Sequence, residues 1–379
     1  MKIIKRHIQD QIESRLFTNN IIIIYGPRQA GKTTLVKEIV KKHDDSIYLN
    51  CELPEIRSLL SSFDIGTIYN YIKNYKIVVF DEAHSIARIG ELLKILFDTY
   101  KDIQFIATGS SSFELSQQIG EPLVGRSWEF MVLPFSLREI TENDFQLQDE
   151  VNNYMLYGGY PEVYHLSPID KKEKLTSIAY QYASKDILAF DGIKKSDIIV
   201  DLLKYIAFQI GNDCSYNGIA DKLQVSSATV KKYIDLLEKT FVIFRLKAYS
   251  KNLKNEINRK FKIYFYDIGI RNGIINQFNQ IDSVSRTDVG AMFENLCIVE
   301  RMKKNILDKN KSPIYFWRSD REGEVDYIEE KDGMLYAFEF KFNQEKRDLS
   351  LVKLPKGFRE NYANNEFKVV DKTGLVEFI

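Results

Sequence analysis

Cysteine is scarce in this sequence of 379 residues. Its three cysteines, Cys51, Cys214 and Cys297, lie far apart, and none of them belongs to a CxxC or Cys/His spacing. The pattern therefore indicates neither a zinc site nor a disulfide framework. A reducing compartment fits best, so we expect the protein in the cytoplasm.

Long hydrophobic runs are absent as well. The longest strongly apolar run near the N-terminus covers residues 21–25, which is far too short to cross a bilayer. Residues 1–10 mix charged and apolar side chains and lack the apolar stretch of a signal peptide. We therefore expect neither export nor a membrane anchor.

Neither sign of charge is in excess, because Lys and Arg number 53 and so do Asp and Glu. An attraction to nucleic acid must therefore come from a local basic patch and not from net charge. The sequence also lacks internal repeats and low-complexity tracts. Apolar residues at 44% and charged residues at 28% are typical of folded globular proteins, and the length allows two or three domains.

Short apolar runs alternate with helical stretches in the first third of the sequence. Strands that are almost wholly apolar are typical of a parallel sheet with helices on both faces. The sequence thus predicts a doubly wound α/β domain over residues 1–145. Its expected elements are strands at 21–25, 46–50, 77–80 and 103–108, and a helix at 32–42.

The pattern changes after residue 145. Residues 146–250 are largely helical, and three helical stretches followed by a β-rich run at 241–246 suit a winged helix. Residues 251–379 mix strands with a long helix at 289–304. Two of these strands, 325–330 and 335–342, are expected to pair as a hairpin around Asp332-Gly333. The sequence therefore predicts two further domains, 146–250 and 251–379.

A glycine-rich loop follows the first predicted strand and begins the first predicted helix. It fits G-x-x-x-x-G-K-[ST], in which backbone N–H groups surround a phosphate at the positive end of the helix. We expect Lys32 to reach the β- and γ-phosphates of ATP, and Thr33 to bind Mg²⁺. The residues of this loop are Gly26, Pro27, Arg28, Gln29, Ala30, Gly31, Lys32, Thr33 and Thr34.

Two adjacent carboxylates, Asp81 and Glu82, end the predicted strand at 77–80. Ligands gather at this edge of open α/β sheets, so both side chains are expected beside the loop. We expect Asp81 to hold the Mg²⁺ ion. Glu82 is then the general base that orients and deprotonates the attacking water.

Hydroxyl groups and an arginine complete the predicted site. Ser110 follows the strand at 103–108 and is our first choice for a polar group near the γ-phosphate, with Thr108 in reserve; an ordinary serine-rich capping loop is the alternative. Arg126 follows a short loop and is a candidate arginine finger, acting in its own chain or from a neighbouring subunit. A purely structural arginine is the competing interpretation.

The combined motifs resemble a widespread prokaryotic group of AAA+-like ATPases that carry a C-terminal domain of unknown function. This resemblance covers nearly the whole chain and implies ATP binding, an AAA+-type sheet and a restriction-endonuclease-like C-terminal fold. The residues that carry it are the loop 26–34, Phe80-Asp81-Glu82, Thr108-Gly109-Ser110-Ser111, Gly125-Arg126, Leu133-Pro134-Phe135-Ser136, Gly158-Gly159-Tyr160-Pro161-Glu162 and Tyr264-Phe265-Tyr266-Asp267.

One departure from this group is Ala83-His84 after the acidic pair. Residues 81–84 therefore read Asp-Glu-Ala-His, which is the signature motif of a class of helicases. Such helicases need a second motor lobe, and no second parallel α/β domain follows. We therefore interpret the match as a coincidence and His84 as a capping or surface residue.

The helical pair 216–223 and 226–239 has the spacing of a helix-turn-helix, with Ser226 as the expected N-cap. Val230, Ile234 and Leu237 share one face, which leaves Lys231 and Lys232 for DNA. A protein-binding role is the alternative. A basic cluster nearby also favours nucleic acid, and it consists of Lys247, Lys251, Lys254, Arg259, Lys260 and Lys262.

The last third contains the D…ExK arrangement of restriction-endonuclease-like folds. Asp326 and Glu339 are candidate ligands of a divalent metal, Lys341 would steady the hydroxide or the phosphate, and Glu294 is a candidate third acid. A hairpin with exposed charges is the competing interpretation. Because strand side chains alternate, Glu339 and Lys341 share a face, and we expect Asp326 to join them there.

These observations predict a Mg²⁺-dependent ATPase whose nucleotide state controls a C-terminal half that binds nucleic acid or a partner protein. The alternatives are an ATP-gated nuclease and an ATP-switched signalling module without nucleic-acid chemistry. The expected cofactors are ATP and Mg²⁺. The expected partners are DNA and further copies of the chain, with no membrane.

Overall fold

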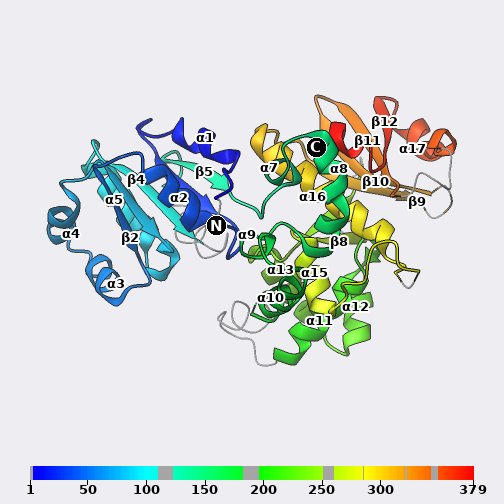
Figure 1. The fold of residues 1–379 in the computed structure, drawn as a ribbon, viewed down its shortest axis with the longest axis horizontal. Coiled ribbons are helices and arrows are strands. Elements are labelled where there is room, and N and C mark those ends of the chain that lie inside the picture. Colours follow the sequence, from blue (N-terminus) through cyan, green and yellow to red (C-terminus); the bar gives the residue numbers. More distant parts are fainter. Residues whose placement is uncertain are drawn as a thin grey trace. The chain divides into compact units, whose positions relative to one another are not determined.

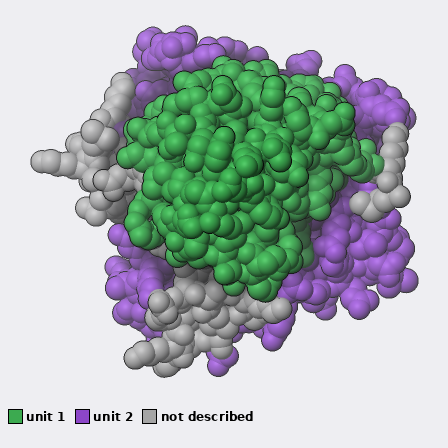
Figure 2. All heavy atoms as spheres, turned by 90° about the vertical axis from the view of Figure 1, so that its left-hand side faces the viewer, with its two compact units in different colours: residues 1–135, 239–241 green, residues 136–238, 242–379 purple. Residues whose placement is uncertain are grey.

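The computed structural model describes residues 3–109, 123–181, 196–250, 260–284, 286–319, 321, 323–342 and 349–379. The chain divides into two compact units (Figure 2), one formed by residues 1–135 with 239–241 and the other by residues 136–238 with 242–379. No helix in the described ranges is long and apolar enough to cross a membrane. The three-domain division at residues 145 and 250 stays a prediction.

The first unit is built on a parallel five-stranded sheet with the order β2-β3-β4-β1-β5. Its helices and strands (Figure 1) are α1 (Ile8–Glu13), β1 (Ile21–Tyr25), α2 (Lys32–Val40), β2 (Ser46–Asn50), α3 (Pro54–Ser61), α4 (Ile65–Ile72), β3 (Ile77–Asp81), the 3₁₀ turn η1 (Ala83–Ser85), α5 (Ile89–Thr99), β4 (Gln104–Gly109) and β5 (Ser127–Met131).

The central strands of this sheet are buried along their whole length, which explains why their sequences do not alternate. All residues of β3 and β4 are buried, as are the four isoleucines of β1. The four predicted strands and the helix at 32–42 are therefore confirmed within a residue or two. The edge strand β5 was not predicted as a strand; it is short, Glu129 interrupts its apolar residues, and Trp128 and Glu129 are exposed.

The second unit combines helices with a mixed seven-stranded sheet of order β12-β11-β10-β9-β7-β8-β6. Its elements are α7 (Leu137–Ile140), α8 (Asp144–Tyr157), α9 (Pro161–Tyr164), α10 (Pro168–Gln181), α11 (Ser196–Phe208), β6 (Asp213–Cys214), α12 (Tyr216–Leu223), α13 (Ser227–Lys239), β7 (Ile243–Ala248), β8 (Phe261–Phe265), α15 (Ile268–Ile275), α16 (Val289–Leu307), β9 (Ile314–Ser319), β10 (Gly323–Lys331), β11 (Met334–Phe340), the 3₁₀ turn η3 (Leu349–Leu351), α17 (Lys356–Asn361), β12 (Asn365–Val370) and α18 (Leu375–Phe378).

The predicted hairpin is confirmed, because β10 and β11 pair antiparallel and Lys331 lies opposite Met334. Asp332 and Gly333 between them both have positive φ angles, 52° and 77°, which suit a tight two-residue turn. The sheet also joins strands that the sequence assigned to separate domains, since β7 pairs with β9 in parallel. One sheet therefore runs through both predicted C-terminal regions.

Candidate functional site

The glycine-rich loop lies between β1 and α2, at the carboxyl edge of the sheet. Gly26 has a φ of 147°, and a Cβ at this position would come within 2.1 Å of the carbonyl oxygen of Val132. Only glycine allows so close an approach between the loop and the segment after β5. Within the loop, Arg28 and Gln29 are exposed, whereas Ala30 is buried.

Lys32 is almost completely buried at the first position of α2. Its Nζ donates hydrogen bonds to the carbonyl oxygens of Gly26, at 2.9 Å, and Pro27, at 2.8 Å. Burial lowers the pKa of this ammonium to about 8, although the charges of Glu82 and Asp81 oppose the change. The lysine is thus held inside the loop, where an anion would meet a positive charge that has little access to water.

Asp81 ends β3 and accepts hydrogen bonds from three hydroxyl groups. Thr33 Oγ1 donates to its Oδ2 at 2.9 Å, Tyr48 also donates to Oδ2, and Thr108 donates to Oδ1. Burial and the bond to Asp81 raise the pKa of Tyr48. The two expected magnesium ligands, Thr33 and Asp81, are therefore neighbours, and their oxygens could share one cation.

Glu82 directly follows β3 in a left-handed conformation, with a φ of 52°. Its backbone N–H donates to Thr108 Oγ1 at 3.0 Å, so one hydroxyl holds both the metal carboxylate and the residue after it. Left-handed backbone costs energy in a non-glycine residue and is concentrated at functional sites. Thr108, the reserve candidate for the polar group near the γ-phosphate, lies next to Asp81. Ser110, the first candidate for that role, lies outside the described residues.

His84 contacts Glu82, with 3.2 Å between Nδ1 of the histidine and Oε2 of the glutamate. Its side chain is only 11% exposed. The interpretation of His84 as a surface residue was therefore wrong, because the turn η1 points it back toward the end of β3.

Arg126 does not reach the phosphate loop of its own chain. It immediately precedes β5, and Ile21 N–H bonds to its carbonyl oxygen, which places it at the amino edge of the sheet. The five residues of β1 separate this edge from Gly26, a length of about 16 Å. Its guanidinium instead pairs with Asp98 at 3.2 Å. Arg126 therefore lies away from the phosphate loop of its own chain, and its role as an arginine finger, in its own chain or from a neighbouring subunit, stays a prediction.

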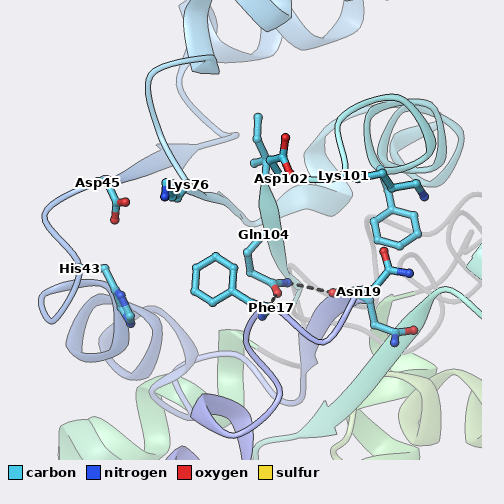
Figure 3. A pocket seen from close by; sticks show the side chains of 11 residues that line it. Phe17, Asn19, His43, Asp45, Lys76, Lys101, Asp102 and Gln104 are labelled. Carbon is cyan, nitrogen blue, oxygen red and sulfur yellow. Dashed lines mark hydrogen bonds between the residues drawn. The ribbon is translucent and has the colours of Figure 1, made fainter.

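A pocket of about 790 Å³ opens at the same amino edge of the sheet (Figure 3), away from the phosphate loop. Gln104 is one of the residues that line the pocket. Its side chain accepts a hydrogen bond from Phe17 N at 2.6 Å and donates one to the carbonyl oxygen of Asn20 at 2.9 Å. These bonds attach the turn before β1 to β4. The polar groups of Gln104 are thus used by the fold.

In the second unit, Ser226 accepts a hydrogen bond from Thr229 N at 3.1 Å, as expected of an N-cap. Val230, Ile234 and Leu237 are buried, and Lys231 and Lys232 are exposed, as predicted. The basic cluster is not one surface, however. Lys262 is completely buried, and Lys251, Lys254 and Arg259 lie outside the described residues.

The C-terminal acids lie together as predicted. Lys341 Nζ pairs with Glu339 Oε1 at 2.6 Å, and the charges of Glu294 and Glu339 act on Asp326, whose pKa is raised well above its ordinary value, first by burial. Lys262, which the sequence placed in the basic cluster, instead contacts Glu294 at 2.9 Å and lies 3.9 Å from Asp326. Among the described residues, no group of three or more Asp, Glu, His or Cys is arranged to hold a metal ion.

Three protein families cover the chain in succession. Residues 18–141 match an AAA domain, residues 148–281 match a domain of unknown function (DUF8612), and residues 289–377 match another (DUF4143). The uncharacterized protein MJ1544 of Methanocaldococcus jannaschii is 27% identical over 374 residues, which cover 90% of this chain and 80% of that protein. An uncharacterized protein of Haemophilus influenzae is 24% identical over 363 residues, 87% of this chain and 86% of that protein.

Among solved structures, the Walker-type ATPase PABY2304 of Pyrococcus abyssi has a similar fold. The TM-score is 0.51 at 16% sequence identity, and the match covers 72% of this chain and 96% of that chain. Residues 18–141 are thus similar to an AAA domain, in agreement with the phosphate loop at the carboxyl edge of a parallel sheet, and residues 289–377 are similar to a domain of unknown function.

Proposed function

We propose that this protein hydrolyses ATP with Mg²⁺ and uses its nucleotide state to control DNA binding by the second unit. The observation that supports hydrolysis best is the set of contacts at one sheet edge. Lys32, Thr33 and Asp81 come from the loop and from β3, and Glu82 follows at once. When bound, Mg²⁺ would neutralise charge on the phosphate oxygens.

The protein groups have separate tasks in this proposal. Lys32 leaves the carbonyl oxygens of Gly26 and Pro27 and donates to phosphate oxygens instead. Thr33 and Asp81 would hold the cation, and Thr108 fixes the carboxylate by its hydrogen bond. Glu82 accepts the proton of the attacking water, and its contact with His84 limits the positions of its side chain.

Arg6 connects the phosphate loop to the segment that leads into the second unit. Its buried guanidinium donates to the carbonyl oxygen of Ala30 at 2.8 Å and to that of Leu133 at 2.5 Å. The carbonyl of Val132 also meets Gly26. A change in the loop on nucleotide binding would therefore act on residues 132–135, after which the chain enters the second unit. We assign the control step to this connection.

Replacing Arg6 by methionine tests that assignment. The loss of two buried, charge-assisted hydrogen bonds, each contributing about 1.5–3 kcal/mol, should destabilise the first unit, measured by urea unfolding. DNA affinity should become equal with ATP and with ADP. Arg57→Met on α3 is the control, since that arginine is exposed. If R6M keeps the full nucleotide dependence of DNA binding, another route carries the signal.

The proposed DNA-binding element is a winged helix formed by α11, β6, α12, α13, β7 and β8. Its support is the order of these elements, the antiparallel pairing of β8 with both β6 and β7, and the exposed lysines on α13. In such folds the second helix of the pair enters the major groove. Lys231 and Lys232 would then meet DNA.

Changing both Lys231 and Lys232 to alanine should weaken DNA binding by roughly tenfold at moderate salt and lower its salt dependence by about two counterions. Fluorescence anisotropy over a salt series measures both quantities. The matched control changes Lys172 and Lys311, which are also exposed but lie outside α13. Equal loss in both double variants would indicate a general charge effect and not a recognition helix.

One assay separates the remaining functions. ATPase rates are measured with and without duplex DNA, and the DNA is inspected for cleavage in Mg²⁺ and Mn²⁺. Stimulation by DNA without cleavage supports the proposal. If the protein does not bind DNA and its ATPase rate is the same with and without DNA, the signalling module with a protein partner is favoured. Cleavage of the DNA favours the nuclease.

A further inference from the structure

Lys262 is a lysine with no exposed side-chain surface. It lies on β8, and its Nζ approaches carboxylates from two other elements. The distances are 2.9 Å to Glu294 Oε1 on α16, and 3.1 Å to Glu324 Oε1 and 3.9 Å to Asp326 Oδ1 on β10. The ring of Phe316 lies 5.4 Å from the same nitrogen and adds a cation–π contact.

The carboxylates of this cluster are already engaged by protein donors. Glu294 Oε1 accepts from Lys262 and also from the hydroxyl of Tyr264. Asp326 Oδ2 accepts from the backbone N–H of Phe340 at 2.9 Å. Glu339 Oε1 accepts from Lys341 at 2.6 Å. A metal ion that binds through these oxygens, at about 2.0–2.6 Å, would have to replace these bonds.

The ammonium keeps its charge in this position. Burial by itself would lower the pKa of Lys262, but the charges of Glu294, Asp326 and Glu324 outweigh burial and raise the pKa above its ordinary value. The ion pairs at 2.9 Å to Glu294 and 3.1 Å to Glu324 favour the charged ammonium in this position. A divalent cation held by Glu294 and Asp326 would lie within a few ångströms of this fixed positive charge and would be repelled by it.

We propose that the ammonium of Lys262 takes the place of the divalent cation in this acidic cluster, so that the C-terminal domain is a metal-free binding scaffold and not a nuclease. The D…ExK residues are present, but they do not fit a metal while Lys262 is there. Lys262 instead joins β8 of the proposed winged helix to α16 and β10 by ion pairs. The cluster then stabilises the sheet that carries both regions.

Further ion pairs continue from Glu324 to neighbouring strands. Arg318 on β9 approaches Glu324 at 3.3 Å and Asp213 on β6 at 3.4 Å, and Lys260 lies 3.7 Å from the same aspartate. Each additional contact again pairs an acid with a protein cation. Strands β6, β8, β9 and β10 are thus linked by side chains as well as by the backbone ladder.

Manganese binding to the full-length, nucleotide-free protein tests the proposal. Mn²⁺ is titrated into the wild type and into Asp326→Asn, and free Mn²⁺ is followed by electron paramagnetic resonance. We expect the same number of bound ions in both proteins and no nicking of supercoiled plasmid that depends on Asp326. A wild-type site that D326N removes, or nicking that D326N abolishes, would overturn the proposal.

Removal of the ammonium gives the complementary test. Lys262→Met keeps most of the side-chain volume and leaves the acids without their counterion, so this variant should bind one more Mn²⁺ than the wild type, and K262M/D326N should not. Lys260→Met is the matched control, since Lys260 is exposed and only two residues away. A folded K262M with no additional site contradicts the replacement. If circular dichroism shows K262M unfolded, the comparison of the wild type with D326N decides alone.

Discussion

Replacing Lys32 by alanine is expected to abolish tight ATP binding. The ammonium is buried in the phosphate loop and bonded only to the carbonyl oxygens of Gly26 and Pro27 among the contacts described for it. The other cation of the loop, Arg28, is exposed. Loss of one partner from a buried charge pair costs about 2–5 kcal/mol, which corresponds to a weakening of ATP affinity by about 30- to 5000-fold.

Isothermal titration calorimetry with ATP and Mg²⁺ measures this effect. The control is Lys41→Ala, which removes an exposed lysine just after the same helix, one that pairs with Glu38. Thermal unfolding of both variants checks that the fold survives. Undiminished ATP affinity in K32A would refute the assignment of the phosphate loop.

The same lysine predicts how ATP binding depends on pH. In the nucleotide-free protein its pKa is lowered to about 8, so the ammonium loses its proton as the pH rises through that value. Phosphate groups favour the charged form and raise the pKa again, so binding above about pH 8 must take up a proton. ATP affinity should therefore fall by up to about tenfold per pH unit above 8. Calorimetry in buffers of different ionisation enthalpy counts the proton, and K32A should show no uptake from this group.

The parallel sheet and the phosphate loop could be predicted because each has a local sequence signal. Buried parallel strands are apolar throughout, and the loop needs Gly26 and Gly31 at fixed positions before Lys32. Asp81 was found for the same reason, at the end of an apolar run. The hairpin of β10 and β11 was marked by Asp332-Gly333, and its alternation brought Asp326 to the face of Glu339.

Residues whose role depends on strand order could not be found in this way. The order β2-β3-β4-β1-β5 places β4 between the loop-bearing strand and β3, so Thr108 reaches Asp81. Tyr48 meets Asp81 because β2 pairs with β3 on the other side. Strand order depends on which strands pair across the sheet, and the residue pattern of a single strand does not contain this information.

The positions of Lys262 and Arg126 could not be predicted from the residues around them in the sequence. A lysine in an apolar strand, Phe261–Phe265, is expected to be exposed. Lys262 is buried instead, because Glu294 on α16 accepts a hydrogen bond from its ammonium. Arg126 follows Gly125 in a sequence motif of the resembling family. Only the parallel pairing of β1 with β5 shows that Arg126 lies at the amino edge of the sheet, opposite the edge of its own phosphate loop. In both residues the decisive neighbour is distant in sequence.

Replacing Glu82 by glutamine should leave ATP binding nearly intact and lower turnover by at least about 10²-fold, the usual contribution of a general base. The glutamine keeps the volume of the side chain and still offers an oxygen to His84 Nδ1, which lies 3.2 Å from Glu82 Oε2. The backbone N–H of residue 82 keeps its bond to Thr108. The lost property is the ability to take the proton of the attacking water.

Phosphate release under saturating ATP measures kcat for this variant, and calorimetry measures its ATP affinity, so that chemistry and binding are separated. Glu91→Gln is the matched control, because the side chain of Glu91 on α5 is 45% exposed and pairs with Arg88. E91Q should hydrolyse ATP at the wild-type rate. Since the left-handed backbone at residue 82 is held by Thr108, Thr108→Val should also lower kcat, by misplacing the base and loosening Asp81. An E82Q protein that turns over ATP as fast as the wild type would show that another group activates the water.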